Sequence, residues 1–461
     1  MERIFIEKTS EYEGKTVKVS GWVHSRRDHG KIIFIDLRDR SGILQVVFTP
    51  KAGEIYKLAD SLRSEWVVSV EGKINLRPKG MQNPAIKTGL IEMSAERLEI
   101  LNPSETPPFL PDTDGYDINE ENRLKYRYID LRRPRLTKNL EMRHKLIKEM
   151  RDYLDANGFI EIETPILTKS TPEGARDYVV PSRLHPGQFY ALPQSPQQYK
   201  QLLMVSGMER YFQIARCFRD EDTRGDRQPE FTQLDIEMSF ITQNDILDLV
   251  EKLMIKITEA AGKKVFQKPF PRIKYEEAIK KFKDDKFDLR KEKDPNILAF
   301  AWVVDFPLFE QTKTKEITSS HHPFTAPKDE DIPLLNKDPM KACSWQHDLV
   351  CNGFELGGGS IRISNAKIQE KIFEILGHSK EEIEAKFGHL LKAFEYGVPP
   401  HGGIALGIDR LMAIFQNEPN IREVIAFPKT GDGRDLMMDA PSDISPAQLK
   451  ELGLSIKQNK T

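Results

Sequence analysis

The sequence has little of the features that mark disulfide-rich, zinc-binding or membrane-spanning proteins. It has only 3 cysteines, which are too few for a disulfide framework and too irregularly spaced for a four-ligand zinc site. The longest uninterrupted apolar run, 297–304, falls far short of the roughly 20 residues that cross a bilayer. We therefore expect this run to be a buried strand, and we expect no membrane partner.

Neither a targeting leader nor an excess of one charge is present. The first eight residues contain no apolar stretch long enough for a signal peptide and no Arg/Ser-rich leader, which predicts a cytoplasmic protein. Lysine and arginine total 69 and aspartate and glutamate 71, so the formal net charge is −2. Any nucleic-acid partner must therefore be held by local basic patches, because the chain offers no global positive field.

What is present is a long globular chain. Its 461 residues are enough for roughly 3 domains, and a composition of 39% hydrophobic and 30% charged residues argues against disorder. Five short segments near the N-terminus read as strands, at 17–23, 32–35, 43–48, 66–70 and 90–93. A helical spacing at 54–63 separates the third from the fourth. Five strands with one helix indicate an OB barrel, and a generic small β-barrel is the alternative.

A segment rich in Pro, Asp, Ser and Thr at 102–119 is typical of a linker, and we place a domain boundary there. Beyond it, apolar spacing predicts a helix over 140–154 that is closed by Asn157-Gly158. A second helix is predicted with Asn244 as its cap and Gly262 at its end. Strands and helices then mix without a regular βαβ rhythm, which favours an antiparallel α+β domain.

The first of three charged clusters combines 218–222 with 227–235. Arg219, Glu221 and Phe231 have the chemistry to hold a nucleotide, with a guanidinium for phosphate, a carboxylate for the adenine amine or a metal, and a ring for the base. A salt-bridged hairpin is the alternative interpretation. The second cluster, 402–410, is a glycine-rich apolar strand that leads into a helix, and it has no Walker ending. Close packing of a helix on a sheet is its alternative.

The third cluster spans 348–362 and contains the glycines at 357–359. Consecutive glycines let a backbone approach a ligand closely, and Asp348 and Glu355 offer oxygen ligands that suit magnesium with a polyphosphate. A flexible surface turn is the alternative interpretation.

Together these clusters resemble the signature motifs of the class II aminoacyl-tRNA synthetases. Residues 158–165 resemble motif 1, 218–231 motif 2 and 402–410 motif 3. Further segments resemble the bacterial-type aspartyl-tRNA synthetases, namely 171–178, 191–197, 321–325 and 426–430. The resemblance covers nearly the whole chain, but the domain of roughly a hundred residues that the bacterial family usually inserts between motifs 2 and 3 is missing near 288–301.

The resemblance implies an OB-fold anticodon-binding domain at 1–103, a hinge at 104–133 and a class II catalytic domain at 134–461, built on an antiparallel sheet flanked by helices. It implies that L-aspartate attacks the α-phosphate of ATP and that the aspartyl-adenylate is then passed to tRNA. Catalysis would consist of positioning and of neutralising phosphate charge. By family position the catalytic residues are Arg219, Arg410 and Glu355.

The same resemblance assigns the binding residues. ATP would contact Arg219, Asp220, Glu221, Gln228, Phe231, Glu355, Gly407, Ile408, Asp409 and Arg410, and Mg²⁺ would be held by Asp348 and Glu355. Aspartate would contact Glu173, Ser195, Gln197, Lys200, Arg219, Asp235, His321 and Arg362. Asparagine would leave the cations Lys200 and Arg362 unpaired. Without the family, the His321-His322 pair would be interpreted as a surface loop.

In the OB domain, Phe34 would stack on an anticodon base, Gln45 would recognise the central base, and Glu92, Arg27 and Arg77 would lie near the first base and the backbone. Phe34 alone would otherwise be interpreted as a core residue. His29 and Gly80 resemble the relaxed form that charges the asparagine tRNA as well as the aspartate tRNA.

The relaxed form implies a downstream amidotransferase, and motif 1 implies a homodimer. The alternatives are a strictly aspartate-tRNA-specific enzyme, an asparaginyl-tRNA synthetase, which the Lys200 and Arg362 cations oppose, and an inactive RNA-binding paralogue.

Overall fold

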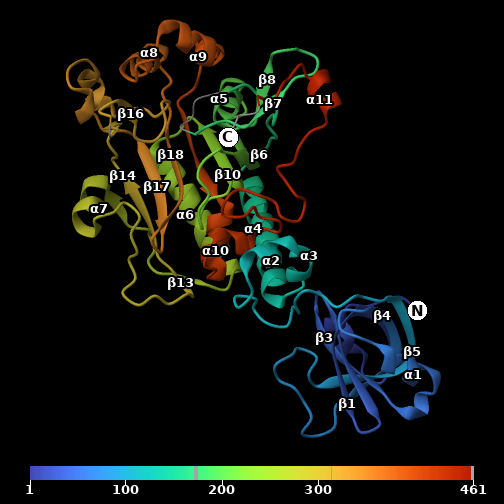
Figure 1. The fold of residues 1–461 in the computed structure, drawn as a ribbon. Coiled ribbons are helices and arrows are strands. Elements are labelled where there is room, and N and C mark those ends of the chain that lie inside the picture. The colour runs from blue at the N-terminus through green and yellow to red at the C-terminus, as the bar shows by residue number, and fades with distance from the viewer. Residues whose placement is uncertain (171–174, 313, 458–461) are drawn as a thin grey trace. The chain divides into compact units, whose positions relative to one another are not determined.

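The structure is a computed structural model that describes residues 1–170, 175–312 and 314–457 (Figure 1). The chain packs into two compact units, Met1–Lys138 and Asn139–Thr461. The division falls inside helix α4, Pro134–Ala156. Within the described residues, no helix combines the length and the apolar character needed to cross a membrane.

The first unit contains a closed barrel of five strands in the order β1-β2-β3-β5-β4. The parallel pairing of β3 with β5 and the antiparallel pairing of β1 with β4 close it. The predicted strands are confirmed, although most run further than their apolar segments. Their bounds are β1 Thr16–His29, β2 Ile32–Asp39, β3 Gly42–Phe48, β4 Val67–Leu76 and β5 Ile91–Asn102.

Alternation of side chains fills the barrel. In β1, Val17, Val19, Gly21 and Val23 are buried, while the residues that alternate with them are only partly buried, as expected for a strand with one face on a core. Helix α1, Glu54–Ser61, lies between β3 and β4 in the chain, as predicted. The unit also contains a 3-10 helix η1, Ile6–Tyr12, and two short helices, α2 at Glu120–Lys125 and α3 at Arg127–Asp130.

The second unit is built on an eight-stranded sheet of order β12-β14-β17-β18-β19-β10-β9-β6. The six inner strands are antiparallel, and the edge strands β12 and β6 each pair in parallel with their neighbour. The predicted α+β class is therefore confirmed. The bounds are β6 Ile160–Glu161, β9 Arg210–Phe218, β10 Glu230–Ser239, β12 Arg272–Lys274, β14 Phe300–Val304, β17 Gln346–Cys351, β18 Phe354–Ile361 and β19 His401–Gly407.

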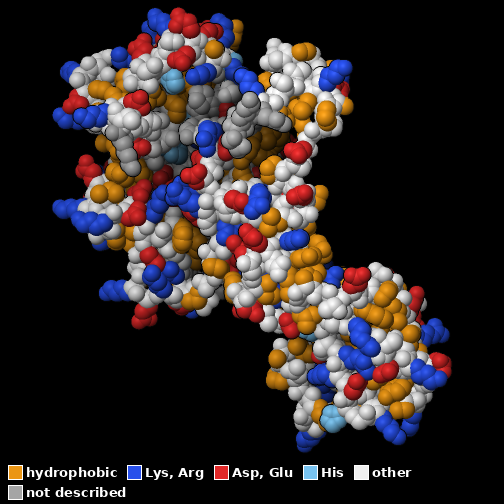
Figure 2. Space-filling model, viewed as in Figure 1, with side chains coloured by type: hydrophobic (Ala, Val, Ile, Leu, Met, Phe, Trp, Pro, Cys, Tyr) orange, Lys and Arg blue, Asp and Glu red, His pale blue; other side chains and the backbone are white. Residues whose placement is uncertain are grey.

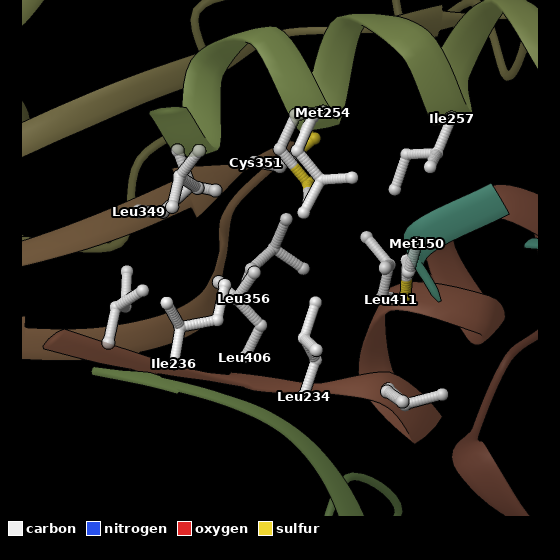
Figure 3. Close-up of a cluster of buried hydrophobic side chains, with 14 of the residues drawn as sticks. Met150, Leu234, Ile236, Met254, Ile257, Leu349, Cys351, Leu356, Leu406 and Leu411 are labelled. Carbon is white, nitrogen blue, oxygen red and sulfur yellow. The ribbon is translucent and has the colours of Figure 1, made fainter. Parts of the chain in front are cut away.

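One face of this sheet is covered by α4 together with α6, Gln243–Ala260, and α10, Ile408–Gln416. Figure 3 shows Met254 and Ile257 of α6 pointing toward Leu234 and Leu406 of the sheet. These side chains belong to one large hydrophobic cluster of fully buried residues. Because this face is sealed, polar side chains of the same strands must lie on the opposite face.

Other helices and small hairpins complete the unit. The helices are α5 Gln197–Val205, α7 Tyr275–Phe282, α8 Ala366–Ile375, α9 Lys380–Phe394 and α11 Pro446–Glu451. The strand pairs outside the large sheet are β7 Val179–Pro181 with β8 Phe189–Ala191, β11 Lys264–Val265 with β13 Ile297–Leu298, and β15 Phe309–Gln311 with β16 Ile317–Ser319.

Two local predictions were wrong. The apolar run 297–304 is not one strand, because β13 ends at Leu298 and β14 begins at Phe300, in a different sheet. The backbone N–H of the intervening Ala299 donates to the side-chain oxygen of Asn352 at 2.9 Å, which interrupts the run. The cap of α6 is Thr242 and not Asn244, because Thr242 and Asp245 form a reciprocal capping box.

Candidate functional site

Strand β10 carries the polar floor of the site. Along it, Leu234 and Ile236 face the helix-covered core, and Gln233, Asp235 and Glu237 alternate with them on the opposite face. Asp235 lies opposite Gln213 of β9 and Ala405 of β19, so it sits in the middle of the sheet. The period of two along a strand thus places carboxylates above the core without interrupting it.

A cavity of about 570 Å³ opens over this face. Figure 2 shows the second unit hollowed, with Lys, Arg, Asp and Glu side chains gathered around the hollow. Most of the predicted substrate residues line the cavity, namely Ser195, Gln197, Lys200, Arg219, Glu221, Gln228, Phe231, Asp235, His321, Glu355, Arg362, Gly407, Asp409 and Arg410.

Four buried charges form a network at one end of the cavity. Lys200 of α5 lies with its Nζ 2.6 Å from Asp235 Oδ1 and 3.2 Å from Glu237 Oε2. Arg362 follows β18 and donates two hydrogen bonds to the Glu237 carboxylate, from Nε to Oε1 at 3.0 Å and from Nη2 to Oε2 at 3.2 Å. All four side chains are at most 2% exposed. Two cations and two carboxylates therefore balance one another away from solvent.

Burial and pairing shift the pKa values of the two carboxyls in opposite directions. Burial raises the pKa of Asp235, and the Lys200 ammonium only partly opposes it. Burial also acts to raise the pKa of Glu237, but Arg362 and Lys200 outweigh it and bring that pKa down to about 2. Glu237 is therefore a permanent anion that holds both cations in place.

Helix α5 turns polar side chains into the same region. Gln197 and Lys200 are three residues apart, so they share one face of the helix, and both are buried. Within the described part of the chain, the side-chain nitrogen of Gln197 is buried without a hydrogen-bond partner. A buried donor without a partner is costly, which suits a position that a ligand oxygen completes.

A second group of residues lies where the resemblance puts the nucleotide. The Arg219 guanidinium lies 5.1 Å from the centre of the Phe231 ring. Arg410, in the first turn of α10, donates to the Glu355 carbonyl oxygen at 2.5 Å and to Asp226 Oδ2 at 3.2 Å. An aromatic ring beside one guanidinium group, with a second guanidinium group in the same cavity, is a suitable surface for a base with an attached phosphate chain.

The three glycines of β18 have different roles. A Cβ at Gly357 would lie 2.1 Å from the Ala405 carbonyl oxygen, and one at Gly359 would lie 2.0 Å from that of Gly403. These two glycines therefore permit close approach of β18 and β19. Gly357 and Gly358 both line the cavity, and a Cβ at Gly358 would collide with the Asp348 carboxylate. The prediction that the run lets the backbone approach a ligand thus fits these two glycines.

The two predicted magnesium ligands are neighbours on the hairpin of β17 and β18. Asp348 does not line the cavity directly, but its carboxylate lies beside Gly358, which does. Burial and the Glu355 carboxylate raise the pKa of Asp348. Glu355 pairs with Lys286, whose Nζ is 3.1 Å from Oε2. The described residues contain no group of three or more His, Cys, Asp or Glu side chains that could hold a metal ion.

The histidine pair lies at the cavity in a segment without regular secondary structure, where His321 is exposed and His322 is partly buried. Desolvation by the surrounding protein lowers the pKa of His321 to about 4, and the nearby Arg362 adds to the effect. His322 is likewise shifted below its usual range by burial and by His321. Both line the cavity, so His321 presents a neutral imidazole there at neutral pH.

Besides Asp348, three predicted residues are not placed at the cavity. The Asp220 carboxylate is 3.7 Å from Arg176 and is half exposed. The Ile408 side chain is fully buried in the core on the helix-covered face. Glu173 lies outside the described residues. Asp409 does line the cavity, and its carboxylate also accepts hydrogen bonds from Arg143 and from the Thr232 backbone, which fixes the start of α10.

The outer face of the barrel brings together three of the predicted anticodon residues. Arg27 donates to Gln45 Oε1 at 3.3 Å, and Gln45 donates to Glu92 Oε2 at 2.8 Å. Asp36, which sequence reasoning missed, also accepts from Arg27 at 2.9 Å. Phe34 is partly exposed beside them and does not belong to the barrel core, which removes the interpretation of Phe34 as a core residue.

The remaining predicted barrel residues lie around this face. Arg77 is buried and donates to the Ile91 carbonyl oxygen at 2.9 Å. His29 is exposed at the end of β1. Gly80 is exposed in the loop between β4 and β5, with a φ of 87° that favours glycine.

Sequence reasoning also missed Glu237, Lys286 and Asp226 in the larger unit. Glu237 lies two residues after Asp235, so the strand alternation was a signal that could have found it. Asp226 lies within the motif 2 segment as a charged residue in a polar turn. Lys286 had no such local signal, because its segment reaches the cavity through long-range packing.

Comparison with known proteins adds two family matches. A family model described as "tRNA synthetases class II (D, K and N)" matches residues 119–431. A second, described as "OB-fold nucleic acid binding domain", matches residues 17–101. The first match covers more than half of the chain.

Curated relatives match over nearly their whole length. A protein of Rubrobacter xylanophilus named "Aspartate--tRNA(Asp/Asn) ligase" is 45% identical, with 96% of this chain and 95% of the relative covered. A protein of Staphylococcus haemolyticus named "Aspartate--tRNA ligase" is 41% identical, with 97% and 98% covered. The first alignment runs over 569 positions against 461 residues here, so more than a hundred positions of that relative have no counterpart.

Solved structures share the fold. Asparaginyl-tRNA synthetase from Pyrococcus horikoshii, complexed with asparaginyl-adenylate, superposes with a TM-score of 0.74 at 23% identity, covering 93% of this chain and 98% of that chain. An aspartyl-tRNA synthetase from Entamoeba histolytica gives 0.74 at 20% identity, covering 93% and 91%. At these identities the likeness concerns the fold alone.

Proposed function

The chain belongs to the class II tRNA synthetases of the aspartate, lysine and asparagine group, and from that premise we propose that it is an aspartate–tRNA ligase. Class II tRNA synthetases use ATP as a substrate. L-aspartate attacks the α-phosphate and pyrophosphate leaves. The aspartyl group of the adenylate then passes to the 3' end of the tRNA, and AMP leaves. No protein nucleophile is needed, so the residues act by positioning and by neutralising charge.

The observation that carries this proposal is the buried cation pair. Lys200 and Arg362 are fixed by Glu237 at the cavity, and each has more N–H donors than these ion pairs use. A substrate side-chain carboxylate would satisfy the remaining donors. Asparagine would turn a neutral amide nitrogen toward them, and leaving buried charges unpaired is costly. The choice of aspartate over asparagine therefore follows from charge.

We assign the nucleotide to the other end of the cavity. Phe231 would stack on the adenine, Arg219 would neutralise the α-phosphate and the aspartate carboxylate, and Arg410 would meet the γ-phosphate. The geometry in support is the position of Arg219 above Phe231 and of Arg410 beside Glu355. Glu221, Gln228 and the start of α10 would complete the contacts.

Asp348 and Glu355 suit a magnesium ion that arrives with the nucleotide. Mg²⁺ is usually bound by one or two carboxylates together with substrate phosphates, and Glu355 lies close enough to Asp348 to raise its pKa. The ion would neutralise negative charge on the phosphates as the transition state forms. The Glu355 side chain also faces the cavity directly.

For tRNA, we propose that 1–103 binds the anticodon, 104–133 is a hinge and 134–461 performs catalysis. The linked side chains Arg27, Gln45 and Glu92 with Phe34 beside them offer edge hydrogen bonds and a stacking ring. His29 and Gly80 are both exposed on this unit, where they can meet RNA. We propose the relaxed specificity that the names of several relatives describe.

The test is charging with labelled aspartate on two separate transcripts, the aspartate tRNA and the asparagine tRNA, at matched concentrations. Charging of both supports relaxed specificity. Charging of the aspartate tRNA alone would overturn the argument from His29 and Gly80 and leave the ligase intact. Absence of aspartate-dependent ATP–pyrophosphate exchange would instead support the inactive RNA-binding paralogue.

We further propose a cytoplasmic homodimer that cooperates with an amidotransferase if it charges both tRNAs. Ile160, Ile166 and Leu167 follow α4 in the motif 1 region and are 51%, 41% and 53% exposed, which suits burial against a second copy. A monomeric sedimentation profile at micromolar concentration would contradict the dimer.

A further inference from the structure

Lys286 enters the catalytic cavity from a segment outside the three synthetase motifs. The segment follows α7 and precedes β13, and both Asp284 and Lys286 line the cavity. The Lys286 Nζ lies 3.1 Å from Glu355 Oε2, and the Lys286 side chain is 45% exposed. The ammonium group is therefore held at the cavity wall and is open to a ligand.

Packing on both sides fixes the backbone at Lys286. The next residue, Phe287, is buried and stacks on Phe282 of α7 with ring centres 4.2 Å apart. The Phe287 carbonyl oxygen accepts from the N–H of Gly353, in the turn between β17 and β18. The backbone N–H of Lys286 itself donates to Asp284 Oδ1 at 2.9 Å. The segment is thus attached to the hairpin that carries Glu355.

Glu355 contacts a second cation besides Lys286. Arg410 donates to the backbone carbonyl of Glu355, and Lys286 pairs with the Glu355 side chain. Two cations therefore converge on Glu355 at this corner of the cavity.

We propose that Lys286 is a further ATP-contacting residue, which exchanges Glu355 for the terminal phosphates of ATP when the nucleotide binds. This inference rests on the proposed function. A partly exposed ion pair is held weakly, whereas a polyphosphate brings several negative charges to the same corner. Lysine is a mobile point charge on a flexible stem and is suited to such an exchange. The same ammonium group then neutralises the pyrophosphate that leaves.

The test compares K286Q with two other variants in the full chain. K286R keeps the charge, and K280Q removes an equal charge from an exposed position on α7 that does not line the cavity. Isothermal titration measures the affinity of each protein for ATP and for inorganic pyrophosphate, with Mg²⁺ and again with EDTA. Aspartate-dependent ATP–pyrophosphate exchange gives the KM for ATP and for aspartate.

We expect K286Q to bind ATP and pyrophosphate about tenfold more weakly, with and without Mg²⁺, since it loses one charge-assisted contact. K286R should stay within about threefold of the wild type, K280Q should be unchanged, and the KM for aspartate should not move. If K286Q keeps its phosphate affinity in EDTA and changes only its Mg²⁺ requirement, Lys286 merely holds Glu355 and the inference is wrong. If the wild type binds no ATP and shows no exchange, the proposed function itself fails.

Discussion

Among individual residues, Glu237 holds two cations, Lys200 and Arg362, in position. It is fully buried and is the carboxylate that touches both cations of the aspartate end of the cavity. E237Q keeps the side chain's shape but leaves Lys200 and Arg362 with one counter-charge between them. Removing one partner of a buried ion pair typically costs about 3–5 kcal/mol. We expect the free energy of unfolding in urea to fall by that amount.

A matched control for E237Q is E259Q. Glu259 pairs with Lys268 at 2.9 Å, but both side chains are about half exposed or more. An exposed pair contributes under about 1 kcal/mol, so its loss should barely move the unfolding midpoint. Equal effects of the two substitutions would show that the ion pairs of Glu237 do not stabilise the folded protein more than an exposed pair does.

His321 gives the site a pH dependence of known sign. Its pKa is about 4 in the folded protein, against about 6.5 in an unfolded chain. Between these values the unfolded chain binds the proton and the folded one does not, so stability rises with pH from about 4 to 6.5. The resulting stabilisation is present above pH 6.5 and is lost as the pH falls toward 4, and water at the exposed His321 side chain weakens it.

The expected measurement compares the wild type with H321N in urea unfolding between about pH 4.5 and 6.5. The slope of the unfolding free energy against pH should be smaller in H321N, by at most one proton. His322 and His347 are also shifted below their usual pKa by burial, so both proteins keep the part of the slope that those residues contribute. Identical slopes would mean that His321 is protonated in the folded protein.

Among the elements, the close approach of β19 limits which residues β18 can carry. At Gly359 a Cβ would lie 2.0 Å from the Gly403 carbonyl oxygen of β19, closer than any real contact. G359A should therefore destabilise the sheet by about 1–3 kcal/mol or more, since overpacking forces backbone shifts. Thermal unfolding checks this against G431A, whose Cβ would meet nothing within 4 Å. A normal melting temperature for G359A would contradict the close approach of the two strands.

Elements with strong local patterns could be predicted, and those that depend on distant partners could not. The barrel strands follow from alternation, and α4 follows from its apolar spacing and Gly158. The break at Ala299 depends on a hydrogen bond that its backbone N–H donates to Asn352, about fifty residues away in the chain. Similarly, the motifs identify Arg219 and Arg410, whereas Lys286 reaches the cavity only because Phe287 packs on α7.

For the whole molecule, the proposed substrates belong to separate units. Phe34 lies on the barrel, and the residues assigned to aspartate and ATP all lie in the second unit. F34A should therefore raise the KM for tRNA about tenfold through loss of one stacked base. Aspartate-dependent ATP–pyrophosphate exchange without tRNA should be unchanged. A parallel loss of exchange would show that Phe34 acts on folding or on the second unit instead.

Strand β10 has one face on the cavity and one on the core, and this limits where insertions and deletions can occur in the chain. From Phe231 to Glu237, alternate side chains belong to the cavity and to the core, so a single inserted or deleted codon in this stretch would exchange the two faces. Asp235 would then enter the apolar interior, and Leu234 would enter the cavity. Length variation among descendants of this gene should therefore be absent from β10 and should accumulate in exposed turns such as 183–187.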